Sequence, residues 1–312
     1  MAGPEAGGRC YLPGSVPQPA PSRRPRRVIA FFATAAIGVV VLLLLVTAAL
    51  WQGQERVVWQ PPGLALPDPP DIQRLEFLAA DSQPLYAYVV GDRKRARGAL
   101  IAFHGNADLA ARLVPWGEEV AKRTGALVVL AEYRGYGGLP GSPTYEGSRR
   151  DARAAWRATR ELLDVPAESI AVFGHSLGSA VATELASALD EEGTPPRVLL
   201  LQSPFTSARD MARLIAPAVL LWDLVSRVHF DTERRVRTLR APVWVSHGTR
   251  DLIIPVRMGR RVHAAAKEKG ELLIVPAAGH NDVAEVAGDD YWRWLEAALS
   301  AASASPPAPR GA

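Results

Sequence analysis

Residues 169–178 read SIAVFGHSLG, and this stretch decides the fold. The apolar run 169–173 predicts a buried strand, and a helical pattern begins at Leu177. Glycines on both sides of Ser176 permit a sharp turn between strand and helix, and such a turn leaves the serine hydroxyl exposed above the end of a sheet. The five-residue pattern also occurs by chance, so its context carries the prediction. Ser176 is our candidate nucleophile.

A serine hydroxyl becomes a strong nucleophile only when a base removes its proton and an acid orients that base. Both residue types follow predicted strands downstream. Residues 242–247 read as a buried strand that leads to Asp251, and the apolar run 272–276 leads to His280. Taken singly, the aspartate would be a loop residue or helix cap and the histidine a solvated side chain. The order of acid and then histidine, each on a loop after a strand, favours a triad.

Acyl transfer also needs two donors for the developing oxyanion. Leu177, directly after the serine, supplies one backbone N–H. The apolar run 100–103 predicts an early strand that ends in HGNA. We expect the N–H of Asn106 to be the second donor, with that of Ala107 as the alternative. His104, at the end of this strand, suits a residue that braces the loop by hydrogen bonding better than it suits a base.

These motifs resemble those of the α/β-hydrolases, in particular a membrane-anchored branch with a small lid. Acyl-protein thioesterases and monoacylglycerol-lipase-like or serine aminopeptidase-like enzymes are among its relatives. The resemblance covers about residues 72–300, and the segments that carry it are HGNA at 104–107, YRGYG at 133–137, GSPT at 141–144, GHSLG at 174–178, SPFTS at 203–207, HGTRD at 247–251 and GH at 279–280. It implies the α/β-hydrolase fold and a serine hydrolase.

The remaining pattern agrees with an α/β class. Residues 75–77 and 85–90 read as antiparallel entry strands. From residue 99 onward, short apolar runs alternate with helical stretches. This alternation predicts a mostly parallel central sheet with helices on both faces.

A second feature lies ahead of this region. Residues 28–50 contain no charged side chain and are rich in Ala, Val, Leu, Ile and Phe. A helix needs ~20 apolar residues to cross a bilayer, so we expect one transmembrane helix. The arginines that precede it place the N-terminus in the cytoplasm and the catalytic domain outside it; they are Arg23, Arg24, Arg26 and Arg27. Trp51 and Trp59 are expected to anchor the segment at the membrane interface.

A cleaved signal peptide is the alternative, because small residues at 46–48 offer a cleavage site. Its apolar core would be too long, since such cores run to ~7–15 residues. A retained signal anchor is therefore favoured. The predicted organisation is a basic disordered tail (1–27), the anchor (28–50), a Pro-rich semi-rigid linker (51–71), the hydrolase domain (72–300) with a lid-like insert at about 204–240, and a disordered tail (301–312).

Charge and composition exclude some functions. The net charge is +4, and residues 1–27 alone hold five arginines and one glutamate, so the rest of the chain is balanced. The positive charge therefore reflects membrane orientation and is no argument for nucleic acid binding. Cys10 is the single cysteine, which rules out an internal disulfide. No metal-ligand spacing or phosphate-binding glycine loop is present, and we expect no cofactor.

The substrate is less well defined. The insert is rich in apolar residues, which favours either an acyl-chain groove beside Ser176 or an ordinary amphipathic helix on the core. The candidate pocket residues are Tyr136, Phe205, Leu221 and Trp222. We expect cleavage of ester or thioester bonds in small or lipid-like acyl substrates. Amide hydrolysis is the alternative, and a non-catalytic membrane-anchored binding protein is less favoured. The sequence indicates no protein partner.

Overall fold

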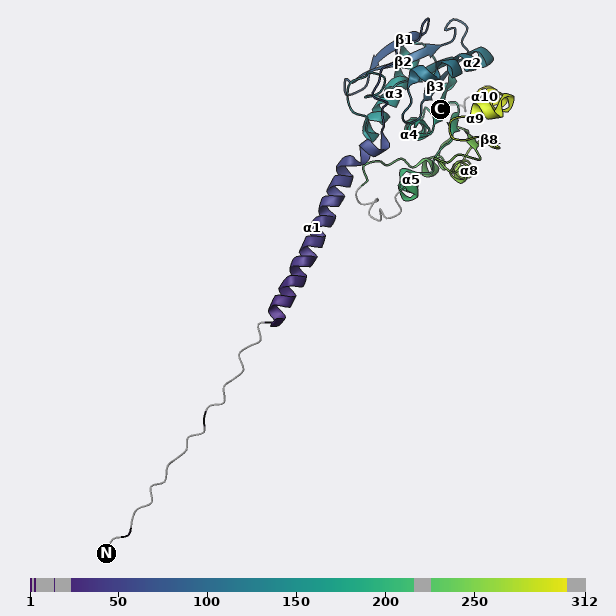
Figure 1. The fold of residues 1–312 in the computed structure, drawn as a ribbon. Coiled ribbons are helices and arrows are strands. Elements are labelled where there is room, and N and C mark those ends of the chain that lie inside the picture. The colour runs from purple at the N-terminus through teal and green to yellow at the C-terminus, as the bar shows by residue number, and fades with distance from the viewer. Residues whose placement is uncertain (2, 4–13, 15–23, 216–225, 302–312) are drawn as a thin grey trace, which may run out of the picture. The chain divides into compact units, whose positions relative to one another are not determined.

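Eight strands form one sheet in the order β1-β2-β4-β3-β5-β6-β7-β8. Figure 1 labels the two edge strands, β1 and β8. This computed structural model describes residues 24–215 and 226–301, together with Met1, Gly3 and Gly14. The strands are β1 Gln73–Leu78, β2 Pro84–Val90, β3 Ala99–Phe103, β4 Leu127–Ala131, β5 Ile170–His175, β6 Leu199–Gln202, β7 Val243–Gly248 and β8 Lys269–Val275. β1 and β2 pair antiparallel, as do β2 and β4, and all later pairs are parallel. The predicted antiparallel entry strands and mostly parallel sheet are confirmed.

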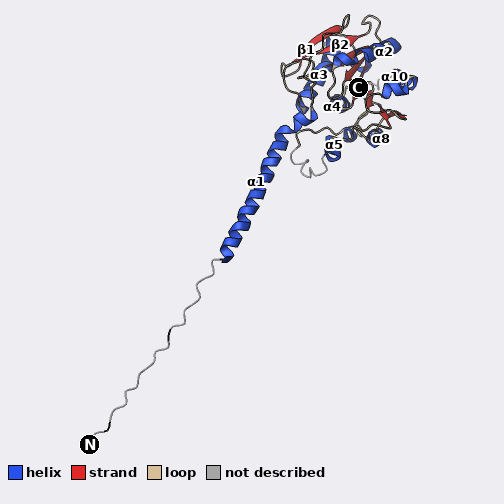
Figure 2. Cartoon of the chain, viewed as in Figure 1, coloured by secondary structure: helices blue, strands red, loops and turns tan. Residues whose placement is uncertain are grey.

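Helices cover both faces of this sheet (Figure 2). They are α2 Val114–Thr124, α3 Tyr145–Glu161, α4 Leu177–Glu191, α5 Ala208–Ile215, α7 Thr232–Arg235, α8 Val256–Ala265, α9 Val283–Ala287 and α10 Asp289–Ala301, with short 3-10 turns η1 Ala110–Leu113 and η2 Ala167–Ser169. The central strand β3 serves both sides, because side chains alternate along a strand. Leu100 and Ala102 pack with α2 and α10, whereas Ile101 and Phe103 pack with α3 and α4. Burial on both faces explains why the strand is continuously apolar.

Two compact units make up the chain, Met1–Ala49 and Leu50–Ala312. Helix α1, Arg24–Val58, begins in the first and ends in the second. Within it, Val28–Val58 is long and apolar enough to cross a membrane, by length and composition. The sequence therefore predicted the apolar segment correctly, but the helix continues beyond residue 50.

The residues that follow α1 depart from expectation. Trp59 is only 2% exposed and belongs to the hydrophobic core of the second unit. Its ring meets the rings of Tyr133, Tyr136 and Phe230 edge-on, with centroids 5.7, 6.5 and 6.2 Å away. The expectation that Trp59 is an interfacial anchor is wrong, because its indole fills space between aromatic side chains of the hydrolase domain. At this residue, the segment 51–71 is part of the domain and not a spacer.

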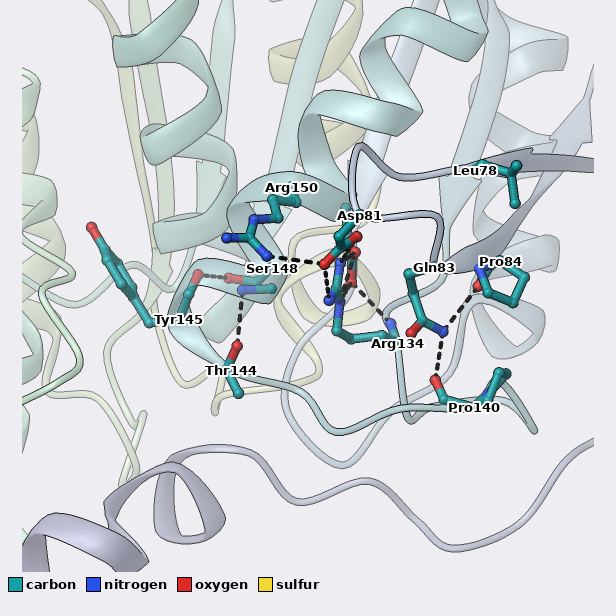
Figure 3. Close-up of polar contacts among 12 residues, drawn as sticks. Leu78, Asp81, Gln83, Pro84, Arg134, Pro140, Thr144, Tyr145, Ser148 and Arg150 are labelled. Carbon is teal, nitrogen blue, oxygen red and sulfur yellow. Dashed lines mark hydrogen bonds and ion pairs between the residues drawn. The ribbon is translucent and has the colours of Figure 1, made fainter.

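A buried ion cluster fixes the loop after β4 (Figure 3). The Arg134 guanidinium lies 2.6 Å from a carboxylate oxygen of Asp151 and 2.8 Å from one of Asp81. Asp151 also accepts a hydrogen bond from the Arg134 backbone N–H. Further along the loop, the Gln83 amide donates to the Pro140 carbonyl at 2.7 Å. The loop is thus tied to α3 and to the β1–β2 hairpin.

Candidate active site

Ser176 lies at the junction between β5, which ends at His175, and α4, which begins at Leu177. Its backbone is strained, with φ 54° and ψ −119°. A Cβ atom on Gly174 would overlap the Gly178 carbonyl, and one on Gly178 would overlap the Phe103 carbonyl. Glycine is therefore required on both sides. Strained backbone of this kind is retained where it aims a functional side chain.

Ser176, His280 and Asp251 form one hydrogen-bonded chain. His280 Nε2 lies 2.8 Å from Ser176 Oγ, and His280 Nδ1 lies 2.7 Å from Asp251 Oδ2. A carboxylate can only accept, so Nδ1 carries the proton and Nε2 accepts from the serine hydroxyl. The three residues come from the ends of β5, β7 and β8, which meet at the same edge of the sheet. The side chains that the sequence singled out are brought together in the order that proton removal requires.

Asp251 is held by more donors than His280 alone. Its Oδ1 accepts from the backbone N–H groups of Ile253 and Ile254, at 2.9 and 2.8 Å. Its Oδ2 also lies 3.2 Å from His247 Nε2. Burial alone would raise the pKa of Asp251, but the hydrogen bonds from His247 and His280 outweigh it and hold the pKa well below its usual range. The carboxylate therefore stays ionised, as a residue that stabilises an imidazolium must.

His247 is a residue to which sequence reasoning assigned no role. It lies at the end of β7 with a fully buried side chain, and its Nε2–H is shared between Asp251 and the Ile254 carbonyl, 2.8 Å away. The signal was available, because the segment HGTRD places a histidine four residues before the acid. The sequence does not show the bend after β7 that brings Asp251 back to His247.

The loop that carries His280 is fixed through its backbone. The His280 carbonyl accepts from His175 Nε2 at 3.1 Å and from Ser203 Oγ at 3.4 Å. Burial, and to a smaller extent the neighbouring His280, lowers the pKa of His175 to about 4. His175 is therefore neutral near pH 7, with the Nε2–H that this hydrogen bond needs.

Two backbone N–H groups are available for an oxyanion. Leu177 is the first residue of α4, where N–H groups have no partner within the helix. Asn106 N–H has no acceptor within the part of the chain that the structure describes. The alternative donor, Ala107 N–H, is already bonded to Asn106 Oδ1 at 3.1 Å. This occupancy favours Asn106 over Ala107 as the second donor.

His104 lies beneath this loop with its side chain fully buried. Its Nδ1 lies 2.8 Å from the Gly105 carbonyl, and its Nε2 lies 2.7 Å from the Glu132 carboxylate. Both partners are acceptors, so both ring nitrogens carry protons. Burial alone would lower the pKa of His104, but the Glu132 charge outweighs it and raises the pKa. The ion pair holds the loop, in agreement with the bracing role expected of His104.

A cavity of about 680 Å³ opens at Ser176. One part of its wall is apolar and includes Leu113, Trp116, Phe173 and Ile253; another is polar and includes Gln60, Asn106, Asp108, Arg112, Gln202, Asn281 and Glu285. Among the described residues, no group of three or more His, Cys, Asp or Glu side chains could hold a metal ion.

Two of the expected pocket residues lie elsewhere. Tyr136 is 1% exposed and packs against Trp59 and His104, and Phe205 is buried against Phe230. Neither belongs to the cavity lining, because both rings are buried among other aromatic side chains. Leu221 and Trp222, the other two candidates, lie outside the described residues.

Comparison with solved structures and family models agrees with this geometry. The esterase Pf2001 of Pyrococcus furiosus superposes with a TM-score of 0.60 at 18% identity, covering 78% of this chain and 99% of that one. The family model described as serine aminopeptidase, S33, matches residues 94–231. The chain has the α/β-hydrolase fold.

Curated relatives of this chain include an uncharacterized protein of Mycobacterium tuberculosis, 37% identical over 192 residues that cover 62% of this chain and 60% of the relative. Another is the lysophosphatidylserine lipase ABHD12 of Danio rerio, 30% identical over 166 residues that cover 49% of this chain and 43% of the relative. The match thus spans 43–60% of the length of these two relatives.

Proposed function

We propose that this α/β-hydrolase is a membrane-anchored serine hydrolase that cleaves carboxylic ester or thioester bonds in acyl substrates. The observation that carries the proposal is the hydrogen-bonded chain from Ser176 through His280 to Asp251 at the cavity. Both distances are within the range that proton transfer between a nucleophile and its base requires.

The reaction follows from these positions. His280 Nε2 takes the Ser176 proton as Oγ attacks the acyl carbonyl carbon, and ionised Asp251 stabilises the imidazolium. The N–H groups of Leu177 and Asn106 donate to the oxyanion. The imidazolium then protonates the leaving alcohol or thiol, which departs and leaves an acyl-enzyme. Water enters by the same route, with His280 again as base, and releases the carboxylic acid and free Ser176.

Two observations support an acyl substrate with a polar partner. The apolar lining residues Leu113, Trp116 and Phe173 suit an alkyl chain, whereas the partly exposed lining residues Asp108 and Arg112, whose charged atoms lie 3.7 Å apart, suit a polar group. The zebrafish relative is named a lysophosphatidylserine lipase, a protein whose substrate has such a composition. A lipid-like ester is therefore the substrate class that we propose.

Labelling with a fluorescent fluorophosphonate tests the activated serine without knowledge of the substrate. The wild-type chain should label, and Ser176→Ala and His280→Ala should not. Ser187→Ala is a matched control, because Ser187 lies on the same helix, α4, but bonds to Glu191 away from the cavity. Ester hydrolysis should fall by about 10⁴-fold or more in the two triad variants. A folded wild type that does not label would instead favour a non-catalytic binding protein.

Membrane insertion is proposed from the apolar span Val28–Val58 of helix α1 and the arginines that precede this span. The positive flank orients the N-terminus to the cytoplasm and the hydrolase domain to the opposite side. An epitope tag at each end distinguishes the outcomes. Before protease treatment, both tags should be on one chain, because the segment is not cleaved as a signal peptide. Protease added to intact cells should then remove the C-terminal tag alone. Loss of neither tag would contradict the orientation.

Amide hydrolysis is the second candidate, because the matching family model is described as serine aminopeptidase. One observation favours it: the exposed Glu285 carboxylate borders the cavity, and no arginine or lysine among the described residues lies within ion-pair distance of it. Such a group could bind the ammonium of a peptide N-terminus. If so, Glu285→Gln should raise the KM for aminoacyl anilides and leave that for uncharged esters unchanged. Equal KM values for aminoacyl anilides in wild type and Glu285→Gln would remove this candidate.

A further inference from the structure

The side chain of Asn106 joins the loop beside Ser176 to the residues that end helix α1. Its Nδ2 donates to the Val58 carbonyl at 2.7 Å, and its Oδ1 accepts from the Gln60 backbone N–H at 2.9 Å. Both partners therefore come from a segment 46 to 48 residues earlier in the sequence. The Asn106 amide thus donates one hydrogen bond to this backbone segment and accepts another from it.

Tyr136 completes the arrangement from a third direction. Its hydroxyl donates to Asn106 Oδ1 at 2.8 Å and accepts from the Gln60 N–H at 3.1 Å. The loop that carries Tyr136 is itself fixed by the Arg134 ion cluster (Figure 3). The amide of Asn106 is therefore held between two rigid elements, one of which is the segment Val58, Trp59 and Gln60.

Trp59 explains why that segment can act as a fixed support. Its indole is 2% exposed and lies against Tyr133, Tyr136 and Phe230, so the carbonyl before it and the N–H after it have defined positions. Burying an aromatic ring of this size is among the largest packing contributions that one residue makes. Residues 58–60 are thus part of the site and do not merely connect it to a membrane helix.

We infer that Asn106 is a positioning residue whose side chain, held by Val58 and Gln60, aims its own backbone N–H at the oxyanion. The inference rests on the proposed function, because it assigns the orientation of a donor in that reaction. Donors to an oxyanion must be in place before the charge develops, and a displacement of about 1 Å can cost about 100-fold in rate. The segment after α1 therefore sets the catalytic rate through one amide.

The test uses the full chain in nonionic detergent with p-nitrophenyl butyrate as substrate. Asn106→Leu keeps the size of the side chain and its backbone N–H but removes all four side-chain hydrogen bonds. We expect kcat to fall by about 10- to 100-fold while KM changes by less than about threefold. Butyl boronic acid, which forms a tetrahedral adduct with an activated serine, should lose affinity by a similar factor.

Gln83→Leu is the matched control, since it removes an amide tether on the Tyr136 loop that lies outside the cavity. It should keep kcat within about twofold of wild type. A wild-type kcat in Asn106→Leu, or a loss confined to KM, would overturn the inference. An equal fall in Gln83→Leu would do so as well, because the effect would then be general loosening of the loops.

Two milder variants keep the test decisive if Asn106→Leu does not fold. Tyr136→Phe removes one hydroxyl, and Trp59→Leu loosens the segment; each should lower kcat by about 3- to 10-fold. Where Asn106→Leu does fold, combining either variant with it should not lower kcat further, because both act through the same amide. Additive losses would contradict this. A wild type that fails to label with fluorophosphonate would overturn the proposed function itself, whereas an active wild type with an unaffected Asn106→Leu would overturn only the positioning role.

Discussion

His247, near the end of β7, contacts Asp251 on the loop that follows, with His247 Nε2 3.2 Å from the carboxylate oxygen that also accepts from His280. The acid of the candidate triad is thus held by a histidine on each side. Only one of these histidines also contacts Ser176, which separates the two roles.

Replacing His247 should weaken the acid without removing it. In His247→Asn the Asp251 carboxylate loses a donor, so its pKa should rise toward the ordinary value. We expect kcat for ester hydrolysis to fall by about 3- to 10-fold at pH 7, with a larger relative loss at lower pH. His263→Asn is the control, because His263 bonds only to the Gly270 carbonyl away from the cavity. A pH profile identical to wild type would exclude this role for His247.

The strained turn at Ser176 predicts a large effect from one methyl group. Gly178→Ala would place Cβ onto the Phe103 and His104 carbonyl oxygens, which belong to backbone that cannot move aside. We expect the free energy of unfolding to fall by about 3 kcal/mol or more, with loss of fluorophosphonate labelling.

Gly117→Ala in α2 provides the comparison, because its Cβ would be 3.4 Å from a methyl group of Leu130, an ordinary contact. Alanine favours the helix, so stability should stay equal or rise by up to about 1 kcal/mol. Thermal denaturation in detergent measures both variants. Similar melting temperatures for the two would show that the turn tolerates a side chain.

The buried position of His175 predicts a dependence of stability on pH. Its pKa falls from 6.5 to about 4 on folding, so between these values the unfolded chain binds more protons than the folded one. The free energy of unfolding is therefore highest above pH 6.5 and falls as the pH drops toward 4. We expect about 2 kcal/mol from this residue, somewhat less than the full shift would give because the ring borders the cavity.

His175→Gln checks this, because an amide can still donate to the His280 carbonyl but does not titrate. Urea denaturation at pH 7.5 and pH 4.5 should show a smaller loss of stability in the variant than in wild type. Equal losses would mean that His175 does not titrate differently in the two states.

The apolar wall predicts chain-length selectivity. Trp116 borders the cavity, and its ring lies 4.7 Å from that of Phe173. Trp116→Ala should enlarge the space for an alkyl chain, so the ratio of kcat/KM for dodecanoyl over butanoyl esters should rise by about 10-fold. Trp292→Ala, on α10 and outside the cavity lining, should leave the ratio unchanged. An unchanged ratio in Trp116→Ala would place the acyl chain elsewhere.

Local sequence patterns were enough to predict much of the fold and of the candidate site. The strand, turn and helix around Ser176 are specified by neighbouring residues, and the loop positions of Asp251 and His280 follow from the apolar runs 243–245 in β7 and 272–275 in β8. Which side of a loop faces the cavity is a different matter, because it depends on elements distant in sequence. The sequence could not place Tyr136 and Phe205 for this reason. Both were predicted to border the pocket, and both are in the core.

Trp59 illustrates another limit of sequence reasoning. A tryptophan just after an apolar helix suits a membrane interface and a protein core equally well, since both offer apolar surroundings. Only the aromatic partners decide between them, and all three, Tyr133, Tyr136 and Phe230, are more than 70 residues away. The role of Asn106 was hidden similarly, because its side-chain partners precede the predicted domain.

The burial of Trp59 fixes the rotation of the last turn of α1, which belongs to the same compact unit. Gln54 accepts from the Arg227 backbone N–H at 2.6 Å, and Trp59 is embedded five residues later, so two points on the last turns are pinned to the same body. One residue inserted between them would rotate one point by about 100° relative to the other, and both contacts could not form together. Insertions and deletions between residues 54 and 59 should therefore be far less tolerated than substitutions.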